Sequence, residues 1–242
     1  MKPRKKARRR GRLRRKLAAL AAALIAAAVL LAFSPLGQQF RGLATPGPPP
    51  VPSAAIVDQT STYDANPEFV AAATDTLEAA GYVVDYYPGE QVTVDLYREL
   101  PAHGYDLILL RVHSARVRED EHGKPIDEVV LFTSEPYTRG KHLQEQATGG
   151  LALALYHEGG DPLFGIRAGF VTSSMRGDFN GATVIMMGCN GLTSVNATAM
   201  AFLGRGAESF TSWDDLISWG HSDAATLRLL ELMLVKGLGE ES

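Results

Sequence analysis

Blocks of apolar residues recur along the chain with two spacings, one typical of strands and the other of helices. Short apolar runs predict strands at residues 54–58, 82–87, 105–112, 128–133, 183–187 and 207–212. The segments between them predict helices at residues 67–80, 94–100, 151–157, 196–203 and 223–236. Strands that alternate with helices are typical of parallel sheets covered by helices. The sequence therefore predicts an α/β fold, a three-layer sandwich with a mostly parallel central sheet.

Three stretches fit this alternation less directly. Residues 115–127 are polar and are interpreted as a long loop over the strand tips. The segment Gly-Gly-Asp-Pro at residues 159–162 predicts a turn. Residues 164–175 are expected to cross the mouth of the sheet.

The first 53 residues differ in composition from the rest. Residues 1–16 hold 11 of the 24 lysines and arginines and are interpreted as a basic cytoplasmic tail. Residues 17–33 form an uncharged apolar run that predicts one transmembrane helix, a signal anchor with its N-terminus in the cytoplasm. A cleaved signal peptide is the alternative. Residues 34–53, which contain TPGPPPVP, predict an extended linker, so residues 54–242 are expected to form an extracytoplasmic domain held at the cell membrane.

Charge changes the range of expected partners. From Ser34 onward the chain holds 13 basic and 27 acidic side chains, a net charge of −14, so nucleic acid is not an expected partner. The chain has one cysteine, Cys189, so stability does not depend on an internal disulfide.

Two residues at predicted strand tips have the chemistry of a nucleophile and a base. Cys189 follows the strand at 183–187, and His113 follows the strand at 105–112. Residues beyond the carboxyl ends of parallel strands gather at one edge of the sheet, where ligands bind. A thiol and an imidazole at that edge form a pair suited to nucleophilic catalysis. His221, which also follows a strand tip, is the reserve candidate for the base.

The residues around Cys189 are suited to an acyl-transfer site. Gly188 lets a substrate backbone approach closely, and the backbone N–H groups of Asn190 and Gly191 are candidate donors to an oxyanion. A tight strand-to-loop turn without a ligand explains the same glycines.

The order of these motifs resembles the caspase-like cysteine peptidases. A strand leads into His113-Ser114, a second strand ends in Gly-Cys-Asn-Gly at residues 188–191, and residues 201–213 read AFLGRGAESFTSW. Caspases, gingipains, clostripain and separase belong to this group, and the likeness is greatest to its CHAT domains. The resemblance covers residues 54–236 and is specific from 183 to 215.

The resemblance implies a caspase-hemoglobinase fold in which Cys189 and His113 form a catalytic dyad that hydrolyses peptide bonds. Ser114 stands where the family usually has glycine, whose backbone N–H helps to hold the oxyanion. Acidic residues after the next strand select basic substrate residues in some members, so Asp214 and Asp215 are the candidate specificity residues.

The sequence thus predicts a membrane-anchored cysteine endopeptidase that acts on a peptide or protein substrate. No metal or organic cofactor is expected, because phosphate-binding glycine motifs and histidines at ligand spacing are absent from the sequence. Two alternatives stay open. One is a catalytically inactive peptidase-like module that binds a partner in the same cleft, and the other is a flavodoxin-like or receiver-like domain that binds a small ligand.

Overall fold

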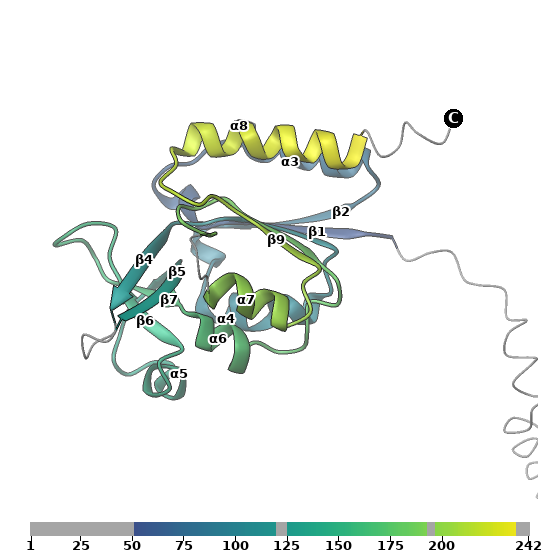
Figure 1. Ribbon diagram of the computed structural model, residues 1–242. Coiled ribbons are helices and arrows are strands. Elements are labelled where there is room, and N and C mark those ends of the chain that lie inside the picture. Colours follow the sequence, from purple (N-terminus) through teal and green to yellow (C-terminus); the bar gives the residue numbers. More distant parts are fainter. Residues whose placement is uncertain (1–50, 120–124, 193–196, 236–242) are drawn as a thin grey trace, which may run out of the picture. The chain divides into compact units, whose positions relative to one another are not determined.

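The computed structural model describes residues 51–119, 125–192 and 197–235 (Figure 1). The predicted basic tail, the predicted transmembrane helix at 17–33 and all but the end of the linker lie outside these residues. Among the residues described, no helix is long and apolar enough to cross a bilayer. The compact unit begins at Val51.

Within the described residues, five parallel strands form the main sheet. These strands are β1 (Ser53–Asp58), β2 (Val83–Pro88), β3 (Leu107–Arg111), β8 (Thr183–Met186) and β9 (Ser209–Thr211). Their order across the sheet is β2-β1-β3-β8-β9. The predicted α/β fold with a mostly parallel sheet is confirmed, and each of these strands falls within or next to a predicted one.

Helices cover both faces of the main sheet, which gives three layers (Figure 1). One face carries α3 (Pro67–Ala79) and α8 (Trp219–Leu230), and the other carries α4 (Val94–Glu99), α6 (Ala168–Ser173) and α7 (Ala197–Gly204). Shorter helical turns are η1 (Gln59–Thr62), η2 (Gly89–Gln91), η3 (Leu100–His103) and η4 (Glu231–Val235). The start of α3 follows local chemistry, because the Asn66 side chain accepts the N–H of Phe69 at 3.0 Å and proline occupies the first turn.

The central strand β3 is buried on both sides. All five of its residues are buried, and the side chains of its four apolar residues alternate between two hydrophobic clusters. Leu107 and Leu109 join the cluster with α3 and α8, whereas Ile108 and Leu110 join the cluster with α4, α6 and α7. A continuous apolar run is the sequence pattern of such a strand.

A smaller antiparallel sheet follows β3 and lies beside one end of the main sheet (Figure 1). Its strands are β4 (Ser114–Glu119), β5 (Pro125–Pro136), β6 (Leu151–Ala154) and β7 (Leu163–Ile166), in the order β4-β5-β7-β6. The short helix α5 (Leu143–Ala147) connects β5 to β6. Because β4 is an edge strand, only one of its sides pairs with a neighbour.

The sequence predictions were wrong in three segments, all in or next to this smaller sheet. Residues 115–127 were predicted as a loop, but most of them belong to β4 and the start of β5, whose pairing depends on backbone groups. Residues 151–157 were predicted as a helix, but pairing with β7 overrides the helix propensity of Leu-Ala-Leu-Ala and forms β6. Residues 164–175 divide into β7 and α6 and are not one crossing segment.

A buried ion cluster joins the ends of the adjacent strands β1 and β3 to helix α8. The side chain of Arg111, at the end of β3, is 1% exposed and donates to Asp58 at 2.9 Å and to Asp223 at 2.9 and 3.0 Å. Its guanidinium also lies 5.7 Å from the Phe69 ring centroid and 5.4 Å from that of Trp219. Ions this deeply buried are tolerated only when they are paired and hydrogen-bonded.

Substitution of Arg111 by methionine is expected to destabilise the protein by about 3–5 kcal/mol, because two buried carboxylates lose their counter-charge. Denaturation of the full chain by urea, followed by circular dichroism, measures this change. Arg228→Met is the matched control, because Arg228 and Glu231 form an exposed pair with side chains 62% and 52% accessible. Its expected cost is below about 1 kcal/mol. Equal losses in the two variants would contradict a dominant role for the buried cluster.

Candidate active site

His113 and Cys189 follow two adjacent strands and line one cavity. β3 and β8 pair in parallel, so their carboxyl ends reach the same edge of the sheet. The cavity has a volume of about 410 Å³. It is lined by His113, Ser114, Ala115, Arg116, Cys189, Asn190, Asp215 and Leu216. The two residues that the sequence proposed as a dyad are thus brought to one place, at the edge strand of the smaller sheet.

The His113 imidazole packs between aromatic rings. Its centroid lies 4.6 Å from that of Phe132, in an edge-to-face arrangement, and 5.1 Å from that of Tyr156. Burial lowers the pKa of His113 below its ordinary value, because an apolar surrounding disfavours the charged imidazolium. At neutral pH the ring is therefore mainly uncharged and able to accept a proton.

The backbone of His113 is held from two sides. Its N–H donates to the Gln59 side-chain oxygen at 3.0 Å, and its carbonyl accepts the N–H of Phe132 at 2.9 Å. Gln59 belongs to η1, directly after β1, and Phe132 belongs to β5. The position of His113 thus depends on the two strands that flank it in space.

The Cys189 sulfur contacts the chain segment that follows β9. The backbone N–H of Ile217 points to the sulfur at 3.4 Å, and the Ile217 carbonyl oxygen lies 3.6 Å from it. The residue is only partly exposed. No hydrogen bond joins this sulfur to the His113 ring within the described residues. A substrate carbonyl can reach the sulfur only where the segment around Ile217 leaves room for it.

Ser114 and Gly188 connect the two strand tips. The Ser114 hydroxyl donates to the Cys189 carbonyl at 2.7 Å. A Cβ atom on Gly188 would lie 2.4 Å from the Val112 carbonyl oxygen and 2.5 Å from the Ser114 hydroxyl. Gly188 therefore has a packing role that does not require a substrate, and the side chain of Ser114 adds a contact that glycine lacks.

The predicted oxyanion donor Asn190 already has a backbone partner. Its N–H donates to the Asp215 carbonyl at 3.1 Å, and two residues later the N–H of Leu192 donates to the Trp213 carbonyl at 2.9 Å. Asn190 also has a positive φ of 59°, a left-handed conformation that asparagine tolerates. The loop after Cys189 is therefore paired with the segment after β9.

Of the two candidate specificity residues, one lines the cavity and the other does not. Asp215 lines the cavity and its carboxylate accepts the N–H of Leu216 at 2.7 Å, whereas Asp214 does not line it. The reserve base His221 does not line the cavity either, and its ring contacts Trp213 with centroids 5.5 Å apart.

Sequence reasoning missed the residues that surround His113. Gln59 had one usable signal, because it directly follows β1 and so lies at a strand tip. Tyr156 follows β6, which was interpreted as a helix, and Phe132 lies within an apolar strand that gives no sign of a ring contact. Their grouping depends on the antiparallel sheet, which the sequence did not reveal.

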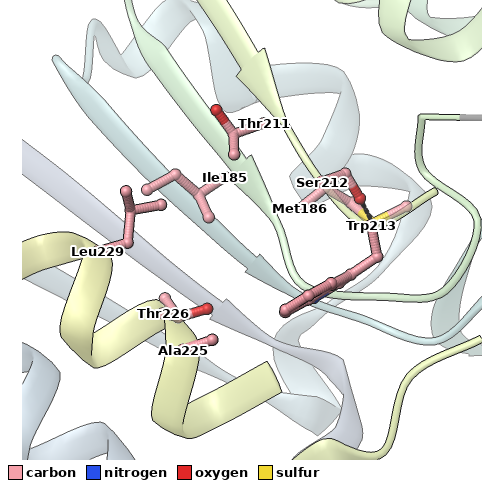
Figure 2. Close-up of a pocket in the computed structure, with 8 residues that line it drawn as sticks. All are labelled: Ile185, Met186, Thr211, Ser212, Trp213, Ala225, Thr226 and Leu229. Carbon is pink, nitrogen blue, oxygen red and sulfur yellow. Dashed lines mark hydrogen bonds between the residues drawn. The ribbon is translucent and has the colours of Figure 1, made fainter. Parts of the chain in front are cut away.

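A second hollow lies at the open edge of the main sheet, between β8, β9 and α8 (Figure 2). It has a volume of about 180 Å³. Its lining consists of Ile185, Met186, Thr211, Ser212, Trp213, Ala225, Thr226 and Leu229. The lining includes no histidine, cysteine or charged residue, so its Ser and Thr hydroxyls have no base beside them in the hollow.

Metal ligands do not cluster in the part of the chain that the structure describes. No group of three or more His, Cys, Asp or Glu side chains there has an arrangement that would hold a metal ion. No family model matches this chain. No curated protein and no solved structure matches it either.

Gly188→Ala is expected to destabilise the protein by about 1–3 kcal/mol, because the added methyl meets the Val112 carbonyl. Gly220→Ala is the matched control, since a Cβ on Gly220 meets no atom within 4 Å and the residue lies in α8. In the control, alanine is expected to leave stability unchanged or to raise it slightly. Urea denaturation of both variants measures the difference, and equal stabilities would contradict the close packing of the two tips.

Proposed function

We propose that this chain is a membrane-anchored cysteine endopeptidase of the caspase-like type, with a caspase-hemoglobinase fold. The supporting observation is that His113 and Cys189, from adjacent strand tips, line the same cavity. The resemblance of residues 183–215 to caspase-like peptidases supports the same assignment. The apolar run at 17–33 is the proposed single transmembrane helix, with its N-terminus in the cytoplasm and the peptidase domain outside.

The proposed reaction uses the uncharged imidazole as a base. His113 accepts the thiol proton as the Cys189 sulfur attacks a peptide carbonyl, and the imidazolium then returns the proton to the leaving amine. Water, deprotonated by the same imidazole, hydrolyses the thioester and restores the thiol. The lowered pKa of His113 suits the first step, because the ring has a free nitrogen at neutral pH.

The features of the strand tips favour this proposal over a flavodoxin-like or receiver-like ligand site. The strand order β2-β1-β3-β8-β9 is the one found in flavodoxin-like sheets, which bind their ligand where β1 and β3 diverge. In this chain, Asp58 and Arg111 end those two strands as a buried ion pair, and Gln59 and Thr60 beyond them are buried. The cavity lies instead at β3 and β8.

A peptide-binding module without catalysis is the second candidate. The observation that favours it is that residues of the same chain already contact the groups a substrate would need. Ile217 contacts the Cys189 sulfur, and the Asp215 carbonyl accepts the Asn190 N–H. In an enzyme, this segment has to shift before a substrate carbonyl reaches both groups. A binding module has no such requirement.

Hydrolysis of fluorogenic peptides by the full chain separates the two candidates. An enzyme is expected to lose all activity in Cys189→Ala and about 10²–10⁴-fold in His113→Ala, because the base is removed. His103→Ala, which changes a histidine outside the cavity, is the matched control and is expected to retain wild-type rates. The peptides carry a basic, an acidic or an apolar residue before the bond to be cleaved. If the wild-type chain hydrolyses none of them faster than Cys189→Ala does, the binding module is the favoured function.

Asp215 is the proposed selector of basic cleavage residues, because it is the acidic residue that lines the cavity. Asp215→Asn is expected to lower kcat/KM for Lys and Arg peptides by about 10-fold relative to Leu peptides, because a charge-assisted contact is lost. Asp214→Asn changes an adjacent carboxylate outside the lining and is expected to preserve the wild-type ratio. Equal ratios in the two variants would remove Asp215 from this role.

A further inference from the structure

Both polar atoms of the Gln59 carboxamide form hydrogen bonds in the surroundings of His113. The residue is wholly buried, and its carboxamide oxygen accepts the His113 backbone N–H at 3.0 Å. Its amide nitrogen donates to the hydroxyl of Tyr156, whose ring lies against the imidazole. A buried carboxamide is costly unless its hydrogen bonds are formed. Two of those bonds are formed to His113 and to the ring that covers it.

Tyr156 completes an aromatic wall around the imidazole. Its ring stacks on Phe132 with centroids 5.2 Å apart, and both rings contact His113. The Tyr63 ring packs edge-to-face with that of Tyr156, with centroids 4.7 Å apart. The wall therefore combines aromatic residues from β5 and from the segments after η1 and β6, and Gln59 of η1 is the polar link between the wall and the His113 backbone.

We propose that Gln59, acting through Tyr156, is a positioning residue that holds the His113 imidazole at the cavity it shares with Cys189. The proposal rests on the proposed function, because it assigns Gln59 to the same base. Gln59 bonds the His113 backbone and the Tyr156 hydroxyl but is not itself one of the residues that line the cavity. Its effect on chemistry therefore passes through the orientation of the ring.

Loss of this link is expected to expose the ring to water. Because burial lowers the pKa of His113, a loosened ring should titrate closer to the ordinary histidine value. The ionisable groups that face the ring region are the Tyr156 phenol, packed against it, and Cys189, Arg116 and Asp215 in the shared cavity. Gln59→Met alters none of them, whereas Gln59→Glu adds a carboxylate that favours the imidazolium, so the titration is compared only between Gln59→Met and wild type.

The test compares Gln59→Met with Gln59→Glu in the full chain. Methionine keeps the length of the side chain but forms neither hydrogen bond, whereas glutamate keeps the acceptor for the His113 N–H. Two readouts are measured against pH: the NMR titration of the His113 ring, assigned by its loss in His113→Ala, and the rate of Cys189 alkylation by iodoacetamide. Gln59→Met is expected to raise the titration midpoint and to slow alkylation at neutral pH about 10-fold, because a misplaced base is inefficient.

In Gln59→Glu, most of the alkylation rate is expected to return, since the carboxylate can accept both the His113 N–H and a hydrogen bond from the Tyr156 hydroxyl. Tyr156→Phe removes a single hydroxyl and keeps the ring, so it tests the link if Gln59→Met fails to fold, and a smaller change in the same direction is expected. Tyr105→Phe is the matched control, because its hydroxyl bonds Asp85 and Tyr87 away from the cavity. It is expected to leave both readouts at wild-type values.

Two outcomes distinguish this proposal from the proposed function. A folded Gln59→Met variant with the wild-type titration and alkylation profiles would overturn the positioning role. Alkylation that is unchanged in His113→Ala, together with a shifted titration in Gln59→Met, would support the positioning of the ring and overturn the catalytic pairing of His113 with Cys189.

Discussion

The buried Arg111 cluster is the interaction on which the site depends. One guanidinium lies between Asp58 of β1 and Asp223 of α8, away from water, and is enclosed by two aromatic rings. Asp58 directly precedes Gln59, and Arg111 lies two residues before His113. The same ion cluster therefore fixes the ends of two adjacent strands and the point from which each chain segment enters the candidate site.

Beyond that cluster, hydrogen bonds hold the backbone of His113 and Cys189, and the Ile217 backbone contacts the Cys189 sulfur. Ser114 bonds the Cys189 carbonyl, and Phe132 bonds the His113 carbonyl, so both residues are held by partners outside their own strands. The Ile217 backbone contacts the thiol in the same structure. This arrangement is compatible with the proposed peptidase and with the proposed binding module, which differ in whether residues 215–217 have to shift.

The sequence predicted the parts of the molecule that depend on burial. Strands with two covered faces are uniformly apolar, so β3 and β8 were found, and the rule that parallel strands end at one edge placed His113 and Cys189 together. Edge strand β4 and the Leu-Ala-Leu-Ala strand β6 were missed, because their pairing uses backbone groups that leave no trace in composition. Without that sheet, the contacts of Tyr156 and Phe132 with His113 had no visible signal. The sequence also could not show that Asp215 lines the cavity and Asp214 does not, since this depends on the directions of two adjacent side chains.

The segment that contacts Cys189 is tethered at both of its ends. On one side, the Trp213 indole N–H donates to the Ser222 hydroxyl at 3.0 Å, and that hydroxyl donates to the Met187 carbonyl at 2.8 Å. On the other side, Trp219 packs over the Arg111 guanidinium. Only residues 214–218 lie between the two anchored tryptophans, so this segment is too short to move far while both indole contacts remain. Any displacement of this segment would therefore disturb the Trp213 or the Trp219 contacts, so its position is coupled to the start of α8, which carries Trp219 and Ser222.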